Sequence, residues 1–417
     1  MFKKAVILIL VFVFAALPNI LLAQETLSLP ALREEAVRNN PEILAAKKQV
    51  EAAKARIPIA KSLDDPVLTF EFEKIPKGTA AVSKTPADDR MLSFSQFLPF
   101  FGKLSLKGKI AFVESRMFIA EYKNKELEVI NSVEKAYYEL FMNVKEIELN
   151  EYSLKILDGI AGIAQARYAT NELPQEELFK IHLEIARLNT VLLNLKEETK
   201  AIQTRLNTLL NRDAEAALGG PALSEDVSFK QDIKLLYLLT MENNPELDIF
   251  RLAIEKNQYA HKLAKRSFFP DLMAQITQRG ITSGAIGPWD LMLAFTVPLW
   301  FWTKQRYQVK EAIANLDEAK AAYEAMRNKA FSETKELFAK VKIAENNVAL
   351  FRSKLIPLLE SSINASLAAY RSGGGDVMAL LDNIRMLIDT KMSLYKVFVD
   401  YYMNVSDLQR QVGKDLI

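Results

Sequence analysis

Side chains that commonly carry catalysis or bind metals are scarce in this sequence. The 417-residue chain has no cysteine and only two histidines, His182 and His261, which lie in different halves. Zinc and copper sites of the usual kind need several such ligands close together, so no metal site is predicted. A phosphate-binding glycine motif and a nucleophile–base pair are also absent. We therefore predict that the protein is not an enzyme and needs no cofactor.

Four short segments alternate apolar and polar side chains, which is typical of strands with one apolar face. In the first, Leu68, Phe70 and Phe72 alternate with Thr69, Glu71 and Glu73. In the third, Leu272, Ala274 and Ile276 alternate with Met273, Gln275 and Thr277, and return strands follow each of these segments. A length of about nine residues suits a tilted membrane strand. Glu71, Glu73 and Gln275 would then face a lumen; otherwise they are surface residues.

Aromatic residues gather where these strands end, as an interfacial girdle in a membrane requires. They are Phe97, Phe100, Phe101, Trp289, Trp300 and Trp302. Four strands cannot close a barrel, and lipid does not tolerate open sheet edges. Three chains would supply twelve strands, which is an allowed number. The alternative is a pair of soluble hairpins packed on helices.

Residues 1–23 have the pattern of a secretory signal peptide: Lys3 and Lys4, an apolar run, and cleavage after Ala23. A retained membrane anchor is the alternative. Without Lys3 and Lys4 the chain has 52 basic and 52 acidic residues, so a nucleic acid partner is not predicted.

The chain is a tandem repeat. Asn39-Asn40-Pro41-Glu42 recurs as Asn243-Asn244-Pro245-Glu246, in a gapless match that places Pro66 on Pro270. In each copy, asparagine can cap a helix and proline suits its first position. We predict a first repeat over 24–211, a linker over 212–232 and a second repeat over 233–417.

Each repeat is predicted to contain a helix, a strand pair, a very long helix, a tip turn and a return helix. The strand pairs span 66–98 and 270–297, and the tip turns span 168–174 and 370–376. The first helices run over 31–63 and 235–268, and the long helices over 103–169 and 304–372, which gives each long helix about 100 Å. The return helix at 174–211 has a heptad seam from Ile181 to Leu209, and a similar seam runs from Val377 to Val405. The fold is thus mainly helical with a β-barrel portion.

These features together resemble the TolC-type outer membrane efflux proteins, and the heavy-metal-type branch is the most similar. The resemblance rests on the doubled NNPE helix start, the strand ends Leu98-Pro99-Phe100 and Val297-Pro298-Leu299, and the two tip turns. It implies a homotrimer in the outer membrane of a Gram-negative-type cell, with a twelve-stranded β-barrel and a helical barrel that extends into the periplasm.

The resemblance also implies which residues act. The tips would contact a periplasmic adaptor, which is a membrane fusion protein, through Tyr168, Asn171, Leu173, Tyr370, Arg371, Gly373, Gly374 and Gly375. Asp382 matches a family aspartate that narrows the closed pore, and Asp376 would replace a second one, since Ala379 occupies its place. The alternative for Asp382 is an ordinary solvated residue.

We therefore interpret the chain as a trimeric outer membrane channel of a tripartite efflux system. It would export substrates passively from a transporter of the inner membrane, of the RND type, and be gated at its periplasmic tip. The alternatives are the outer membrane duct of a type I protein secretion system and, in a different class, a periplasmic adaptor or a structural coiled-coil protein.

Overall fold

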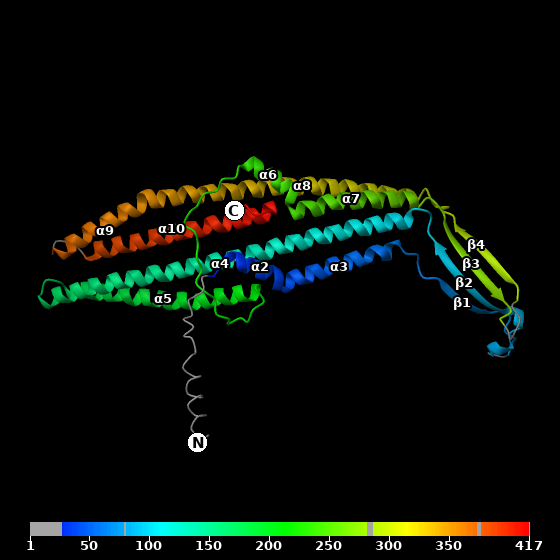
Figure 1. Ribbon diagram of the computed structural model, residues 1–417, viewed down its shortest axis with the longest axis horizontal. Coiled ribbons are helices and arrows are strands. Elements are labelled where there is room, and N and C mark those ends of the chain that lie inside the picture. Colours follow the sequence, from blue (N-terminus) through cyan, green and yellow to red (C-terminus); the bar gives the residue numbers. More distant parts are fainter. Residues whose placement is uncertain (1–26, 79–80, 282–286, 373–376, 417) are drawn as a thin grey trace, which may run out of the picture. The chain divides into compact units, whose positions relative to one another are not determined.

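The computed structural model describes residues 27–78, 81–281, 287–372 and 377–416 (Figure 1). The predicted signal peptide therefore lies outside the described residues, as do Gly373, Gly374, Gly375 and Asp376. Among the helices of the described ranges, none has the length and apolar character needed to cross a membrane.

One sequence of elements occurs twice along the chain. The first half contains α2 (Leu29–Asn39), α3 (Pro41–Lys61), β1 (Val67–Phe72), β2 (Arg90–Leu98), α4 (Lys103–Ala169) and α5 (Gln175–Leu209). The second half contains α6 (Ile233–Asn243), α7 (Pro245–Arg266), β3 (Asp271–Arg279), β4 (Trp289–Thr296), α8 (Lys304–Leu350), a π-helical turn (Phe351–Leu355), α9 (Ile356–Arg371) and α10 (Val377–Val412). Two short 3₁₀ turns, Val82–Lys84 and Ala87–Asp89, lie between β1 and β2.

The first helix of each half is broken, which corrects the continuous helices predicted over 31–63 and 235–268. The break falls at Asn40 and at Asn244, whose backbones are extended. The Asn40 side chain accepts hydrogen bonds from the N–H groups of Glu42 and Ile43, and Asn244 accepts one from Leu247. The repeated NNPE stretch is therefore the boundary between two helices, because an asparagine cap and a proline at the first position start a new helix.

The second long helix is also interrupted, whereas α4 covers 103–169 without a break. At Phe351–Leu355 the N–H of Ile356 donates to the carbonyl of Phe351, five residues earlier. The interruption stands next to Pro357, which has no backbone N–H to continue an α-helical ladder. The single helix predicted over 304–372 is therefore two helices joined by a π turn.

The chain folds as two compact units that do not coincide with the sequence repeats. Unit 1 comprises Met1–Arg38, Ser132–Phe229 and Lys340–Ser406, and unit 2 comprises Asn39–Asn131, Lys230–Ala339 and Asp407–Ile417. Each unit thus takes segments from both halves of the chain.

Unit 1 is built from long helices packed along heptad seams. In α5 the buried residues Ile181, Leu188, Leu192, Leu195, Ile202 and Leu206 all belong to the predicted seam. Leu381, Ile384 and Ile388 of α10 join Ile181 and Leu188 in one hydrophobic cluster with Leu157 and Ile160 of α4. The seam therefore holds α4, α5 and α10 together, as heptad packing predicts.

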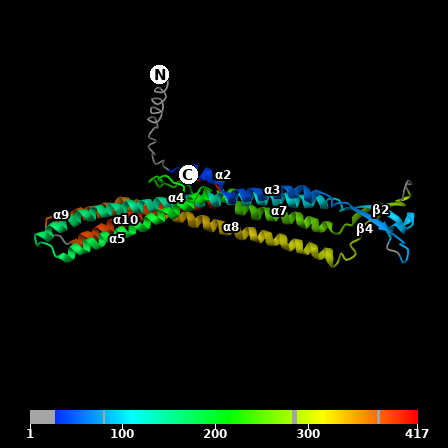
Figure 2. The same ribbon diagram turned by 90° about the horizontal axis from the view of Figure 1, so that it is seen from below.

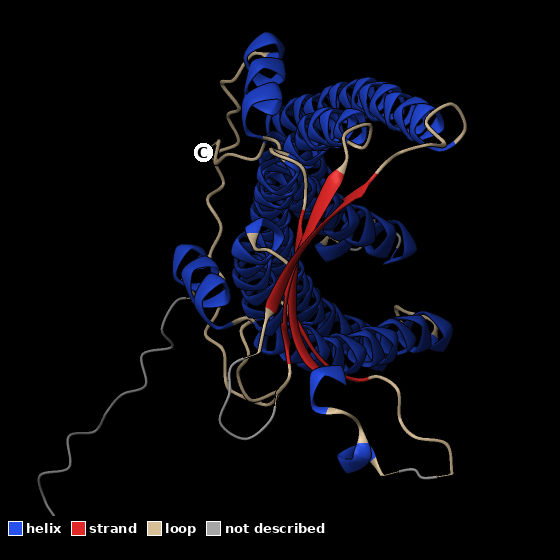
Figure 3. Ribbon diagram, turned by 90° about the vertical axis from the view of Figure 1, so that its right-hand side faces the viewer, coloured by secondary structure: helices blue, strands red, loops and turns tan. Residues whose placement is uncertain are grey.

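Unit 2 combines α3, α7 and parts of α4 and α8 with a sheet that extends beyond the ends of these helices (Figures 1 and 2). The sheet is four-stranded and antiparallel in the order β1-β2-β3-β4 (Figure 3). Strand β2 of the first half pairs with β3 of the second, so the two hairpins form a single sheet.

The hydrogen bonds of Asn244 allow its contribution to stability at the start of α7 to be tested. Besides capping α7, its amide donates to the carbonyl of Gln411 at 2.7 Å, and the residue is 4% exposed. We expect Asn244→Ala to lower the free energy of unfolding by about 2 kcal/mol, because it removes a cap and a buried hydrogen bond.

Asn244→Ser is the matched control, since serine keeps the cap but does not replace the amide donor. Thermal unfolding followed by circular dichroism should place it between the wild type and Asn244→Ala. Equal stability of all three proteins would contradict the role given to Asn244.

Candidate functional site

The strand register separates the side chains of the sheet into two faces. Leu68 pairs with Phe94, Phe94 with Ile276, and Ile276 with Leu291, so these four lie in one row on one face. We call this side the apolar face. Its large side chains are exposed: Leu68, Phe70, Phe72, Phe94, Ile276, Trp289, Leu291, Leu293 and Phe295. Soluble proteins rarely expose so continuous an apolar surface.

The opposite side, the polar face, carries hydroxyl, amide and carboxyl groups. Ser93 and Thr277 pair across β2 and β3, and their hydroxyl oxygens are 2.9 Å apart. Glu71 and Gln275 lie on this face, and Gln275 donates to the Thr277 hydroxyl at 3.1 Å. Glu73 follows the end of β1, where its N–H donates to the carbonyl of Asp89.

The predicted interfacial aromatics do not all occupy equivalent places. Trp289 is exposed at one end of β4, and Phe101, Trp300 and Trp302 are exposed near the helix ends. Phe100 stacks on Phe269 with ring centroids 4.5 Å apart. Phe97 pairs with Met273 and shares the side of Ser93, so it lies on the polar face.

The tip of unit 1 begins with the turn between α4 and α5. The N–H of Asn171 donates to the carbonyl of Tyr168, and the N–H of Glu172 to that of Arg167. Asn171 has φ 59°, a conformation that glycine usually supplies in this type of helix end. Asparagine is the non-glycine residue that best tolerates it, which explains a glycine-free turn here.

The predicted tip residues divide into exposed and buried sets. Tyr168 is 40% exposed, and Asn171 and Arg371 are also exposed. Leu173 and Tyr370 are 7% and 0% exposed and belong to the hydrophobic cluster. The Arg167 guanidinium lies 5.3 Å from the centre of the Tyr370 ring, and burial raises the pKa of Tyr370. Leu173 and Tyr370 therefore shape the tip from inside.

A buried ion pair, which the sequence did not reveal, joins α5 to α10 behind the tip. Arg385 donates to both carboxylate oxygens of Glu184, at 3.2 and 2.6 Å, and Arg187 approaches the same carboxylate at 3.3 Å. The Glu184 side chain is 7% exposed. Arg385 also contacts Asp382 at 3.3 Å, and the Asp382 side chain is 64% exposed.

Two opposing effects set the pKa of Glu184. Burial alone would raise the pKa, but the hydrogen bond and charge of Arg385, with the charge of Arg187, outweigh burial and lower it. Asp382 is thus one carboxylate of a charged group whose other members are Arg385, Glu184 and Arg187.

The sequence contained one signal for this pair. Glu184 follows Ile181 by three residues and precedes Leu188 by four, so it lies on the apolar stripe of α5. A carboxylate at such a position needs a cationic partner. Arg385 lies 201 residues further along the chain, and no local pattern connects the two.

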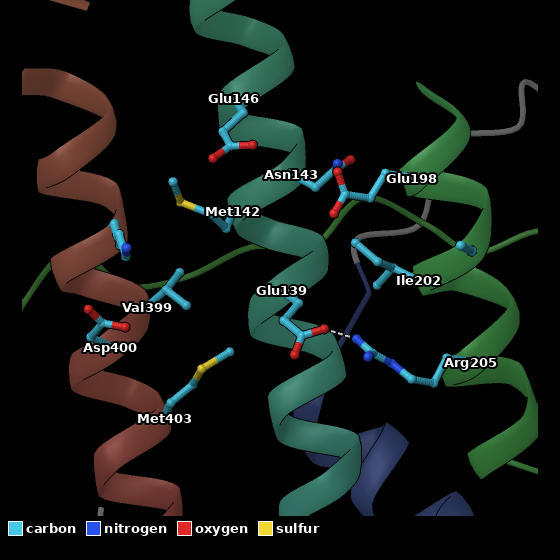
Figure 4. A pocket seen from close by; sticks show the side chains of 12 residues that line it. Glu139, Met142, Asn143, Glu146, Glu198, Ile202, Arg205, Val399, Asp400 and Met403 are labelled. Carbon is cyan, nitrogen blue, oxygen red and sulfur yellow. Dashed lines mark ion pairs between the residues drawn. The ribbon is translucent and has the colours of Figure 1, made fainter. Parts of the chain in front are cut away.

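A groove of about 530 Å³ lies between α4, α5 and α10 in the same unit (Figure 4). Glu139 of α4 forms an ion pair with Arg205 of α5 at one end. Burial, followed by the charge of Glu198, raises the pKa of Glu146, and burial raises the pKa of Asp400. The described residues contain no group of three or more His, Cys, Asp or Glu side chains able to hold a metal ion.

The chain matches the outer membrane efflux protein family over residues 32–170 and 236–414, and it belongs to that family. This confirms the family resemblance found in the sequence. The protein is accordingly an outer membrane protein of a Gram-negative-type cell that extends into the periplasm. No curated protein matches the chain significantly.

Solved structures with the same fold include VceC from Vibrio cholerae, at 17% identity and a TM-score of 0.78, covering 93% of this chain and 97% of that one. CusC has 16% identity and a TM-score of 0.80 over 93% of this chain and 92% of its own. The open state of Neisseria gonorrhoeae MtrE has 17% identity and a TM-score of 0.75 over 93% and 89%. The mainly helical fold with one small antiparallel sheet is thus confirmed.

The lowered pKa of Glu184 predicts an acid-dependent loss of stability. A carboxylate whose pKa is lower in the folded state stabilises the fold above its unfolded value, about 4.3, and loses this effect as pH falls through the folded value. At pH 7 we expect Glu184→Gln to cost about 1–2 kcal/mol, less than a fully buried pair because Arg385 is 42% exposed.

Thermal unfolding at pH 7, 5 and 4 measures this effect. The difference between the wild type and Glu184→Gln should shrink as the pH falls. Glu197→Gln, on the exposed face of α5, is the control and should change little at any pH. A difference that is the same at pH 4 and pH 7 would exclude the ionised pair as its source.

Proposed function

We propose that three copies of this chain form a channel across the outer membrane and that the channel passively exports substrates. The observation that carries this proposal is the exposed apolar face of the sheet. Burying this face in lipid removes it from water at a gain of roughly 25 cal/mol per Å². Neither the α-helices nor the loops of the described unit cover it.

The edges of the sheet determine how many chains are needed. In the described residues β1 pairs only with β2, and β4 pairs only with β3, so each chain has two unpaired edges. Each unpaired backbone group in lipid costs several kcal/mol. Three copies joined from β4 of one to β1 of the next give a closed barrel of twelve strands.

Closure also assigns a role to the polar face. With the apolar face toward lipid, Glu71, Glu73 and Gln275 line the lumen, and so do Ser93 and Thr277. Trp289, Trp300, Trp302, Phe100 and Phe101 lie near the two membrane interfaces. Phe97 lies on the polar face and would therefore face the lumen.

Neighbouring residues of β1 test this assignment. Phe70→Asp places a charge on the lipid side, which costs less than the roughly 2–4 kcal/mol of an Arg or Lys at the membrane centre but still destabilises the barrel, so we expect it to reduce the amount of trimer in the outer membrane. Thr69→Asp places the same charge on the lumen side and should leave the trimer intact. Fractionation and unheated gel electrophoresis measure both, and equal behaviour of the two variants would contradict the face assignment.

The helix tips of unit 1 would meet a periplasmic adaptor that bridges to an inner membrane transporter of the RND type. Tyr168, Asn171 and Arg371 are exposed there, while Leu173 and Tyr370 hold the tip in shape. Gly373, Gly374 and Gly375 lie outside the described residues and stay predicted contacts of the second tip. Membership of the family and the apolar tip cluster support this assignment, as does the sequence resemblance to the heavy-metal-type branch.

The gate is proposed to be a ring of carboxylates near the second tip. Threefold symmetry would bring three copies of Asp382 together, and Asp376, which lies outside the described residues, stays a predicted second member of the gate. Arg385 holds Asp382 beside the buried Glu184, so the ring is tied to the contact between α5 and α10. Opening then requires this contact to change when the adaptor binds.

Single-channel conductance in planar bilayers tests the gate. We expect Asp382→Ala to raise the conductance, because it removes three carboxylates from the constriction. Asp389→Ala, two helical turns further along α10, is exposed and serves as the control that should conduct as the wild type does. No rise for Asp382→Ala would remove this residue from the gate.

A further inference from the structure

Positive charge is concentrated where the helices of unit 2 end beside the sheet. The last eight residues of α3 (54–61) and α7 (259–266) and the first eight of α4 (103–110) and α8 (304–311) contain three lysines or arginines each. The same four segments contain a single acidic residue, Glu311. We call these twelve cations the basic collar. The sequence as a whole has 54 basic and 52 acidic residues, so the collar departs sharply from the average.

The collar is available to a partner. All of its cations except Lys103 are exposed, and Lys103 pairs with Asp271 at 2.7 Å. The eleven exposed cations form no ion pair with any carboxylate of the described residues. Even when Asp64 and Asp65 before β1 and Asp271 at the start of β3 are counted, the region carries a net charge of +8.

Helix stability explains only half of this arrangement. Cations at the C-terminal ends of α3 and α7 are favoured by the helix dipole. Cations at the N-terminal ends of α4 and α8 are disfavoured by the same dipole. Lys103, Lys304 and Arg306 lie in the first turns, where this effect acts, while Lys107, Lys109 and Lys310 lie beyond them. Lys103 has a partner in Asp271, so the retention of Lys304 and Arg306 against the dipole points to an interaction outside the chain.

The collar adjoins an exposed aromatic surface. Phe268 and Phe269 follow the end of α7, Phe101 precedes α4, and Trp300 and Trp302 precede α8. All five side chains are exposed. Arg266 lies 5.9 Å from the centre of the Phe269 ring and also donates to the carbonyl of Phe101. Aromatic residues followed by lysine and arginine are the side chains that a membrane interface selects.

We propose that the basic collar binds the headgroups of anionic phospholipids in the leaflet that faces the periplasm. This inference rests on the proposed insertion of the sheet, which puts the aromatic residues at the interface and the collar just outside it. Each lysine or arginine within a few ångströms of an anionic surface gains attraction, and threefold symmetry brings the charge of a complete ring to +24. The collar would fix the depth of the channel and its choice of lipid.

Native mass spectrometry of the full-length protein with added phosphatidylglycerol or phosphatidylethanolamine tests the proposal. The collar variant combines Lys107→Gln, Lys304→Gln, Arg306→Gln and Lys310→Gln. The control variant combines Lys47→Gln, Lys155→Gln, Lys230→Gln and Lys234→Gln, which are exposed cations away from the collar with the same total charge. A third variant exchanges lysine and arginine at the four collar positions and keeps their charge.

The wild type should bind phosphatidylglycerol more tightly than phosphatidylethanolamine. The collar variant should lose at least about tenfold in affinity for phosphatidylglycerol, since four charges are removed, while the control and charge-preserving variants keep it. Equal affinity of the wild type and the collar variant, or an equal loss in the control, would overturn the proposal. The mass of the lipid-bound species also gives the number of chains in the complex. A complex that is not a trimer would contradict the proposed function, whereas the difference in lipid affinity between the variants tests the collar independently.

Discussion

In the described residues, the sheet exposes an apolar face and leaves both of its edge strands unpaired. Most other features depend on what covers this face and pairs with these edges. In water, both the apolar side chains and the free backbone groups of β1 and β4 favour association. In lipid, the apolar face is stabilised but the edges become costly. The proposed pairing with further copies satisfies both conditions. The duplication of the chain serves this end, because β2 of the first half pairs with β3 of the second and yields one four-stranded sheet in place of two hairpins.

The helical part follows a different principle, since much of its packing lies within one chain. Heptad seams bury Leu188, Leu192 and Leu195 of α5, and a hydrophobic cluster closes the tip around Tyr370. These contacts supply most of the stability there. The Glu184–Arg385 pair adds little net free energy, because desolvation offsets much of its attraction. Its effect is one of specificity: a carboxylate in the seam is tolerated only in the register that brings Arg385 to it.

Local patterns made part of this structure predictable. The alternation of Leu68, Phe70 and Phe72 gave a strand, and the seam from Ile181 to Leu209 gave the return helix, because each depends on the period of one element. The NNPE stretch contained the helix break at Asn40 and Asn244, although continuous helices were expected. The pairing of β2 with β3, the π turn before Pro357 and the contact of Glu184 with Arg385 were not predictable in this way. The two pairings depend on residues far apart in the sequence, and Pro357 marks where the helical ladder is interrupted without determining how the helix continues. The tip residues 373–376 lie outside the described ranges.

The different energetics of the two units indicate which one can change shape. Opening a closed sheet in lipid would expose a row of backbone groups, each at a cost of several kcal/mol, and no modest binding energy could offset that. At the tip, helices pack along seams of leucine and isoleucine, and the Arg385 side chain is already 42% exposed, so water can replace its contacts in part. The π turn at Phe351–Leu355 lies between α8 and α9 next to Pro357, and π turns and prolines are places where helices bend. A conformational change that controls passage through the channel is therefore expected in the helices of unit 1, while the proposed barrel stays closed.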